Sequence, residues 1–477
     1  MVARSGILQL VLLLSVGLPF ACVGTQTPSE VLALTHVTVV NVTTATSQSD
    51  RTVVIAGDRI TRIDQAPPPN GARVIDGRGK FLIPGLCDMH VHLAGVTADP
   101  KWSKATLLPL LIANGITTVR DMGGDLAALQ SWRKDIAAGK LIGPRIYCPG
   151  PMLDGGKSQP PDLLAVATPN EARAAVRDLQ AKRADFVKVL SRLDRETYFA
   201  IADESKKQGM TFVGHVPHAL QAREVSEAGQ KSIEHIFYSN LTFDCSARED
   251  ELRRKATEAR AETDSAGAAA ARDEANASFS PEKAAALAKT MVRNKTWLVP
   301  TLVAIRAIAQ QREAARSNPP ELAYLPPALR AKWAPNEIEK EVSPQVAQWY
   351  SAQFQTDLKI TRALHQAGVQ MLAGSDSLDP LNFPGPSLHV ELSLLVEVGF
   401  TPMQALQAAT SKPAEFFGTR DWGTIAPGRI ADLVLLEANP LEDIRNSRRI
   451  SAVVVGGKLH DRAALDQLLA EARRTVR

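Results

Sequence analysis

The stretch Pro84-Gly85-Leu86-Cys87-Asp88-Met89-His90-Val91-His92 decides the fold of this chain. Its apolar residues predict a buried strand, on which His90 and His92, two positions apart, face the same side. Eight such apolar runs alternate with longer stretches that carry helical signals: Leu86–His92, Ile116–Met122, Arg145–Cys148, Phe186–Leu190, Thr211–His215, Ser232–His235, Trp297–Leu302 and Val369–Gly374. Eight alternating strands and helices predict an α/β fold, a parallel (β/α)8 TIM barrel.

Short β-type runs flank this repeat on both sides. Before it, Gly57-Asp58 separates two β-branched runs, which predicts a hairpin. After it, residues 421–464 return to the same pattern. We therefore expect a small composite β-sandwich domain formed by residues 31–84 and 421–464, a metal-binding barrel over 85–420, and a C-terminal helix over 465–477.

Two stretches are longer than ordinary barrel connections, near residues 244–295 and 305–366. Their sequence pattern predicts helical insertions, and both follow the ends of predicted strands. They lie either over the mouth of the barrel or at the periphery as solvated helices, and the sequence leaves both possibilities open.

The N-terminus resembles a targeting segment. Arg4 precedes the mostly apolar run Ile7–Phe20, which is too short to span a bilayer and is typical of a signal peptide. We expect residues 1–22 to be a signal peptide of an exported protein, periplasmic or extracellular, the alternative being a buried N-terminal helix. Cys22 leaves open a lipid anchor, which is the one membrane attachment we expect.

Composition excludes several classes of protein. The chain has 477 residues, and its 22% of charged residues is ordinary for a globular protein. Lys plus Arg minus Asp plus Glu is 55 − 51 = +4, which gives no reason to expect a nucleic-acid partner. Four cysteines are too few for a disulfide scaffold. The sequence does not decide whether the chain forms a homo-oligomer.

Polar side chains gather at the predicted strand ends: His90, His92, His215, His235 and Asp376. One histidine alone is more often a packed core residue than a ligand. A barrel, however, brings the carboxyl ends of its strands to one mouth, and imidazole with carboxylate is a typical ligand set for Zn²⁺. The pattern therefore predicts a metal site.

Lys188 lies in the otherwise apolar run Phe186–Leu190, where an ammonium group is costly to bury. A desolvated lysine loses its proton more easily and can react with CO₂, and the resulting carbamate can bridge two metal ions. The alternative is a lysine whose head reaches the barrel mouth, and spacing alone does not decide between them.

At this point the sequence resembles the amidohydrolase superfamily, from about Val37 to Leu459. The resemblance rests on residues 84–92, on Gly115–Asp121, on Gly374-Ser375-Asp376 and on the tail Gly423–Val434. Within the superfamily the chain looks closest to the imidazolonepropionase-like, prolidase-like branch. The resemblance implies a metal-dependent hydrolase that cleaves C–N bonds of a small amide or dipeptide with a metal-activated hydroxide.

The resemblance also implies roles for single residues. Two divalent metal ions, Zn²⁺ in the first place, would be held by His90, His92, Lys188, His215, His235 and Asp376. Lys188 would bridge them as a CO₂-derived carbamate, and Asp376 would be the catalytic general base. Tyr238 is a candidate for contacting the substrate oxyanion, and His218 either binds substrate or packs a loop.

Two other functions remain open. A prolidase-type dipeptidase or carboxypeptidase must recognise a free carboxylate and needs a cationic anchor at the mouth, which the sequence does not identify. A small-amide hydrolase needs no such anchor. A non-catalytic secreted binding protein on the same fold is the third possibility, although no predicted ligand position is missing.

Overall fold

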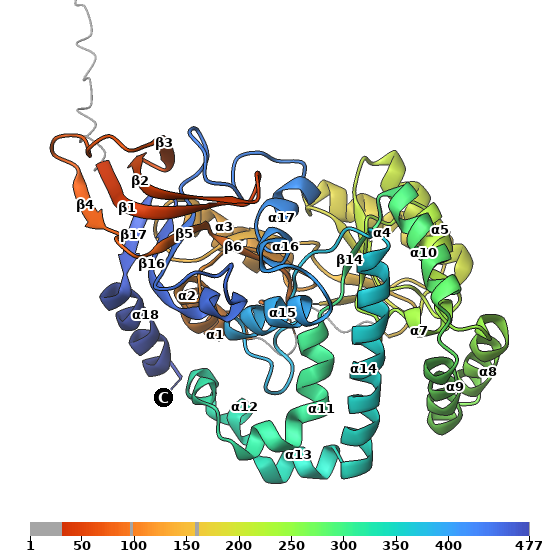
Figure 1. The fold of residues 1–477 in the computed structure, drawn as a ribbon. Helices are drawn as coiled ribbons and strands as arrows, with labels where there is room; N and C mark the ends of the chain where they lie inside the picture. The colour runs from red at the N-terminus through yellow and green to blue at the C-terminus, as the bar shows by residue number, and fades with distance from the viewer. Residues whose placement is uncertain (1–30, 96–98, 158–161, 477) are drawn as a thin grey trace, which may run out of the picture.

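The computed structural model describes residues 31–95, 99–157 and 162–476 (Figure 1). The predicted signal peptide, residues 1–22 with Cys22, and its alternative as a buried helix lie outside the described residues. Within the described part, none of the helices combines the length and the apolar character needed to cross a membrane.

Strands from both ends of the chain share one sheet. Its order is β17-β16-β15-β5-β1-β2-β3, and β4 pairs with β1. The strands are β1 (Val31–Asn41), β2 (Thr46–Ala56), β3 (Arg59–Asp64), β4 (Arg73–Asp76), β5 (Phe81–Pro84), β15 (Leu433–Leu436), β16 (Ile450–Val455) and β17 (Lys458–Asp461). The antiparallel pair β5–β15 joins the two ends. Figure 1 shows the blue strands β16 and β17 beside the red and orange strands of the N-terminal part.

The local sequence explains this sheet. The predicted hairpin forms between β2 and β3, where Gly57 adopts a φ of 62° that a glycine takes at little cost. Alternate apolar side chains of β1, β2 and β15, such as Leu34, Val53 and Leu433, are buried in a core of their own. The sheet is therefore held by a hydrophobic face as well as by its hydrogen bonds.

The middle of the chain supplies two parallel sheets, β6-β7-β8 and β10-β9-β11-β12-β13-β14. Their strands are β6 (Leu86–Val91), β7 (Ile116–Asp121), β8 (Arg145–Tyr147), β9 (Met152–Asp154), β10 (Leu163–Ala165), β11 (Val187–Val189), β12 (Phe212–Gly214), β13 (Ser232–Glu234) and β14 (Trp297–Val299). Seven of the eight predicted runs thus contain a strand, whereas β9 and β10 were not predicted.

The eighth predicted strand, Val369–Gly374, is not regular. Met371 makes a single bridge to Leu298 of β14, and Ser377 makes one to Val91 of β6. Between them, the Ala373 backbone N–H donates to the carbonyl of Ala408 and not to a neighbouring strand. The segment therefore lies between β14 and β6 without a continuous ladder.

Helices separate most of the strands. The helix α4 (Pro169–Ala181) shows why they begin where they do: Thr168 Oγ1 accepts from the Glu171 backbone N–H, and Pro169 occupies the first turn. The short helices are α1 (Pro100–Trp102), the π-helix η1 (Ser103–Leu107), α2 (Leu108–Ala113), α6 (Ala222–Glu227), α7 (Leu241–Asp244), α16 (Pro402–Ala408), α17 (Ser411–Phe416) and the 3-10 helix η3 (Ile444–Arg448). The longer ones are α3 (Leu126–Ala137), α4 (Pro169–Ala181), α5 (Arg195–Lys207), α15 (Pro386–Glu397) and α18 (Arg462–Arg474).

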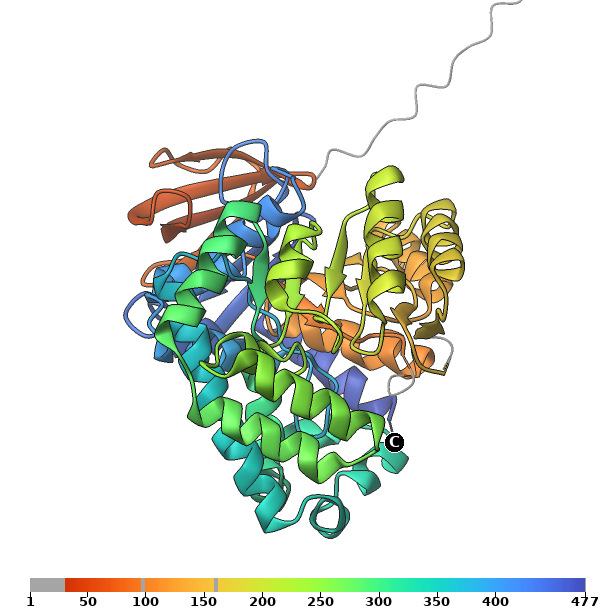
Figure 2. The same cartoon turned by 90° about the vertical axis from the view of Figure 1, so that its right-hand side faces the viewer.

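The two long connections contain helices. The first holds α8 (Glu249–Ala261), α9 (Ser265–Ala277) and α10 (Pro281–Asn294). The second holds α11 (Leu302–Arg316), the 3-10 helix η2 (Pro320–Tyr324), α12 (Pro327–Lys332), α13 (Pro335–Glu341) and α14 (Pro344–Gln366). In Figures 1 and 2, α8, α9 and α11–α14 occupy the end of the molecule opposite the strands β1–β4.

Candidate metal centre

The structure brings the predicted histidines and Asp376 together. Asp376 Oδ1 lies 3.3 Å from Nε2 of His90 and 3.3 Å from Nε2 of His92, and Asp376 Oδ2 lies 3.8 Å from Nδ1 of His235. Ligand atoms of His90, His235 and Asp376 lie within 4.8 Å of one another. The His215 ring centroid is 5.0 Å from that of His235. This donor set of nitrogens and a carboxylate fits a divalent transition metal.

Strand ends position these side chains. His90 is in β6, His92 follows β6, His215 follows β12 and His235 follows β13. His235 and Asp376 adopt left-handed backbone conformations, with φ of 66° and 52°. This conformation costs about 1–2 kcal/mol for a residue with a side chain, and such strain tends to occur at functional sites. The backbone of Asp376 is fixed by hydrogen bonds to the His90 carbonyl and from Asn382 Nδ2.

Each imidazole is oriented by an acceptor at its Nδ1. The pairs are His90 with Glu234 Oε2 at 3.0 Å, His92 with the Gly123 carbonyl at 3.4 Å, His215 with Ser191 Oγ at 2.8 Å and His235 with Thr301 Oγ1 at 2.6 Å. Both hydroxyls donate onward to backbone carbonyls, so they accept from the imidazoles. Protonated Nδ1 atoms leave each Nε2 with a lone pair, which is the usual arrangement of metal-binding histidines.

The acceptor of His90 belongs to a buried ion pair that sequence reasoning missed. Arg120 Nη2 lies 2.8 Å from Glu234 Oε2, and both side chains are fully buried. Arg120 Nε also donates to the Met89 carbonyl at 2.7 Å. The sequence signal for this role was the position of Glu234 directly before His235. Neighbouring residues of a strand face opposite sides, so Glu234 and His235 point in different directions.

Lys188 is buried in β11, with 1% of its surface exposed, so its head does not reach solvent. Burial lowers the pKa of its ammonium group to about 8, and Arg120 adds to this effect against the attraction of Glu234 and Asp376. Burial likewise lowers the pKa values of His90, His215 and His235, so these imidazoles are held neutral, as metal ligands must be.

The two candidate substrate residues lie beside this cluster. The Tyr238 ring stacks on His215 with centroids 6.0 Å apart and lies 5.1 Å from the His235 ring. The His218 backbone N–H donates to the Ser191 carbonyl at 2.8 Å, and its Nδ1 lies 2.9 Å from Asn240 Nδ2. Tyr238 is thus in contact with the histidine cluster, and His218 stands at its edge.

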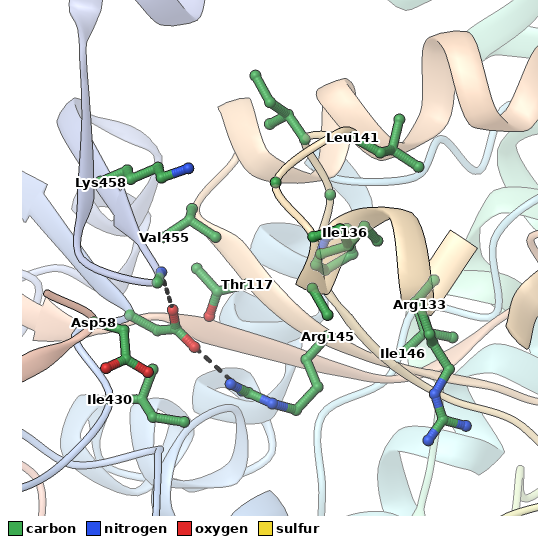
Figure 3. A pocket seen from close by; sticks show the side chains of 18 of the residues that line it. Asp58, Thr117, Arg133, Ile136, Leu141, Arg145, Ile146, Ile430, Val455 and Lys458 are labelled. Carbon is green, nitrogen blue, oxygen red and sulfur yellow. Dashed lines mark hydrogen bonds and ion pairs between the residues drawn. The ribbon is translucent and has the colours of Figure 1, made fainter. Parts of the chain in front are cut away.

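A cavity of about 860 Å³ lies elsewhere, between the end of α3, the start of β8 and the C-terminal strands (Figure 3). Arg145 crosses it to form an ion pair with Asp432 at 3.1 Å. None of the predicted site residues lines it. Because Arg145 begins β8 whereas the histidines follow strand ends, the cavity belongs to the opposite end of the parallel strands.

Sequence comparisons point to one family. A model of the amidohydrolase family matches residues 81–460. An ochratoxinase from Aspergillus niger is 34% identical over 119 residues, and an imidazolonepropionase from Deinococcus deserti is 38% identical over 84 residues. These alignments cover 23% and 17% of this chain and only 24% and 21% of the relatives.

Solved structures share the fold over most of the chain. A bottromycin amidohydrolase superposes with a TM-score of 0.71 at 22% identity, covering 95% of this chain and 91% of its own. A Xaa-Pro dipeptidase with bound methionine gives 0.67 at 22%, covering 91% and 100%. The A. niger ochratoxinase gives 0.64 at 20%, covering 91% and 95%. With the family model matching most of its length, this chain belongs to the amidohydrolase family.

Proposed function

We propose that the protein is a metal-dependent hydrolase that cleaves C–N bonds in a small amide or dipeptide. The observation that carries this proposal is the convergence of His90, His92 and His235 on Asp376, with His215 beside His235. Each of the four imidazoles has its Nδ1 bound to an acceptor. Family membership supports it, since amidohydrolases depend on metals. A prolidase-type dipeptidase or carboxypeptidase is the more specific version of this function.

We further propose a pair of divalent ions, Zn²⁺ in the first place. His90, His92 and Asp376 would hold one ion, His215 and His235 the other, with Lys188 between them as a carbamate. The donor set fits, because burial keeps three of the imidazoles neutral and Asp376 offers carboxylate oxygens. When bound, the ions would supply Lewis acidity to water and to the substrate carbonyl.

The carbamate forms from the neutral amine. The Lys188 Nζ lone pair attacks the carbon of CO₂, an N–C bond forms, and one N–H proton leaves to solvent. The side chain changes from cationic to anionic, which removes the repulsion between an ammonium group and two cations. Its burial in β11 beside Arg120, whose charge also disfavours the ammonium form, supports this step.

The chain's own groups supply the proton transfers. Asp376 takes a proton from the attacking water and passes it to the leaving amine. The Tyr238 hydroxyl donates to the substrate carbonyl oxygen as negative charge develops there. Burial raises the pKa of Tyr238, so this phenol keeps its proton at neutral pH.

We also propose that the parallel strands close into the predicted (β/α)8 barrel. Backbone hydrogen bonds at both gaps between the two sheets support closure. At one gap, the segment that ends at Asp376 bonds to both sheets, because the Leu372 N–H donates to the Leu298 carbonyl of β14 and the Asp376 N–H to the His90 carbonyl of β6. At the other gap, the Asp185 N–H donates to the Cys148 carbonyl. We propose in addition that residues 31–84 and 421–464 form a composite β-sandwich domain, that the barrel spans residues 85–420, and that the protein forms a homo-oligomer. The last proposal is that the protein is exported, with or without a lipid at Cys22. Intact mass of the exported protein tests the last: loss of about the first 20 residues supports it, and Met1 on cytosolic protein contradicts it.

The central experiment measures metal content and hydrolysis together. Protein loaded with Zn²⁺ should approach two ions per chain and hydrolyse members of a dipeptide and amide library. Chelator-treated protein should lose activity and regain it on reloading. Full activity at one ion per chain or fewer would contradict the two-metal site but not the proposal that the protein is a hydrolase. A loaded protein that hydrolyses nothing would favour the non-catalytic binding protein.

A further inference from the structure

Four arginines surround His218 at the edge of the histidine cluster. Burial, and to a smaller extent the charges of these arginines, lower the pKa of its imidazole to about 3; the arginines are Arg260, Arg272, Arg253 and Arg192. Two of them are neutralised, Arg192 by Asp154 at 2.7 Å and Arg253 by Asp244 at 2.7 Å. Arg260 and Arg272 form no ion pair with any described residue. The charges of these two guanidinium groups are therefore not neutralised by an ion pair.

The two unpaired guanidinium groups converge on one oxygen. Asn240 Oδ1 accepts from Arg272 Nη2 at 2.7 Å and from Arg260 Nη2 at 3.3 Å. Arg272 is 7% exposed and also donates to the Phe237 carbonyl at 2.9 Å, whereas Arg260 is only partly buried. Asp357 and Asp273 attract Arg272, but neither forms an ion pair with it. Arg260 repels Arg272 across their shared neutral acceptor, and an anion that bound to both would relieve this repulsion.

This charged cluster adjoins the candidate metal centre. The Asn240 amide Nδ2–H donates to His218 Nδ1, so the neutral imidazole carries its proton on Nε2. That Nε2–H has no hydrogen-bond partner within the described residues. Asn240 follows Tyr238 by two positions, and the His218 backbone binds Ser191, which orients His215. A donor and two cations thus stand on the same rim as the predicted substrate residues.

We propose that Arg260, supported by Arg272 and by His218 Nε2–H, forms a subsite for the free carboxylate of the substrate. The inference rests on the proposed function and narrows it to amides of amino acids, dipeptides included, that carry a carboxylate on the leaving-amine side. A guanidinium group matches a carboxylate with two parallel hydrogen bonds. The insertion helices α8 and α9, which supply Arg260 and Arg272, are then part of the site and not peripheral.

Binding of two inert ligands tests the subsite without turnover. The probes are an N-methylphosphonate derivative of L-proline, of the kind bound in a related prolidase structure, and the same derivative of L-prolinamide. Metal-loaded wild-type protein should bind the acid at least about tenfold more tightly than the amide, because a charged hydrogen-bonded pair contributes that much. Titration calorimetry measures both affinities. The two probes carry the same phosphonate group, so its contacts with the metal ions do not contribute to the difference between the two affinities.

Variants on α8 separate the subsite from general charge effects. Arg260→Gln should remove the preference for the acid, and Arg260→Lys should keep part of it, because the charge stays but the planar fork is lost. Arg254→Gln is the matched control: Arg254 lies on the same helix, 63% exposed and paired with Glu258, and its loss should leave the preference unchanged. Thermal unfolding checks that all three variants fold.

The outcomes distinguish the two proposals. Equal binding of acid and amide by the wild type, or equal losses in Arg260→Gln and Arg254→Gln, overturns the subsite and leaves the hydrolase proposal intact. A preference for the acid that depends on Arg260, in a protein that hydrolyses no amide, supports the subsite and contradicts the hydrolase. With turnover, Arg260→Gln should raise KM for a dipeptide by roughly tenfold or more and change kcat less.

Discussion

At the scale of single residues, the direction of each imidazole depends on what its Nδ1 contacts. The Nδ1 of His90 contacts Glu234, whose carboxylate also forms an ion pair with buried Arg120. A carboxylate behind a ligating histidine fixes the tautomer and raises the basicity of the other nitrogen. Glu234 is therefore a positioning residue for the predicted metal ligand.

Replacing Glu234 by Gln should weaken metal binding and stability together. We expect Zn²⁺ affinity to fall about 10- to 100-fold, since the acceptor loses its charge. Arg120 is left as an uncompensated buried cation, at a cost of about 3–5 kcal/mol in unfolding free energy. Competition titration with a zinc chelator and urea denaturation measure the two effects. Glu227→Gln is the control, because exposed Glu227 pairs with Arg293 and should change stability by less than about 1 kcal/mol. Unchanged zinc affinity in Glu234→Gln would refute the positioning role.

The chemical form of Lys188 is the second prediction at this scale. Lys188→Ala should lose most bound metal and activity, and acetate or propionate in the buffer should restore part of both by filling the vacated space. Lys188→Arg should not be rescued, because its guanidinium group stays charged and fills that space. Elemental analysis and activity assays measure the outcome. If Lys188→Arg binds two ions and turns over normally, the carbamate bridge is wrong.

At the scale of elements, the close approach of β11 and β12 places Lys188 beside His215. Gly214 allows it: a Cβ there would lie 2.1 Å from the Val189 carbonyl oxygen, and its φ is 140°. Gly214→Ala should push the strands apart and destabilise the fold by more than about 2 kcal/mol. Gly209→Ala, at φ 64° with open space around it, should cost only about 1–2 kcal/mol and leave metal binding intact. Denaturant unfolding and zinc titration measure the effects of both substitutions on stability and on metal binding. Equal effects would contradict the proposal that Gly214 permits the close approach of β11 and β12.

The start of α11 is the second feature at this scale. Glu391 of α15 accepts from the Val303 backbone N–H at 2.8 Å, just after Thr301, which orients His235. Burial raises the pKa of Glu391 to about 8, against about 4.3 in an unfolded chain. Between these values the folded state binds more protons than the unfolded state, so this contribution to stability is complete below about pH 4 and is lost as pH rises through about 8.

The substitution Glu391→Gln should therefore flatten the pH dependence of stability. The glutamine oxygen can still accept from Val303, but the side chain no longer titrates. The wild type should lose up to about 1.4 kcal/mol per pH unit more than the variant over the range between the two pKa values. Urea denaturation at several pH values measures both slopes. Parallel slopes would show that Glu391 does not titrate in this range.

At the scale of the whole molecule, the two ends of the chain depend on each other. β15 lies between β5 and β16 in the sheet, so the C-terminal strands complete what the N-terminal strands begin. A chain that ends at residue 420 should be insoluble or lack native strand content, because β5 is left as an open edge and an apolar face loses its cover. A chain that ends at residue 461, without α18, should keep the sheet. Solubility and far-ultraviolet circular dichroism compare the two; a soluble, native-like chain ending at 420 would contradict the dependence.

The sequence by itself determined the periodic features. Apolar runs alternating with helical stretches located seven of the eight strands, and polar residues at their ends located the histidine cluster with Asp376. These inferences succeed because strand burial and the direction of side chains along a strand are set by residues close together in the chain. The segment Val369–Gly374 was predicted as a strand, and Leu372 and Ala373 do form backbone hydrogen bonds with β14 and β6. It lacks a regular ladder because the Ala373 N–H donates to the Ala408 carbonyl, which belongs to a helix.

Only the tertiary structure decided which partners meet across the chain. Glu234 orients His90 from 144 residues away, and Arg272 reaches Asn240 from an insertion that could equally have stayed at the periphery. Such contacts depend on how whole elements pack, and no local pattern encodes them. The sequence therefore identified the residues that could bind metal, whereas folding determined how they are oriented and placed a positively charged cluster beside them.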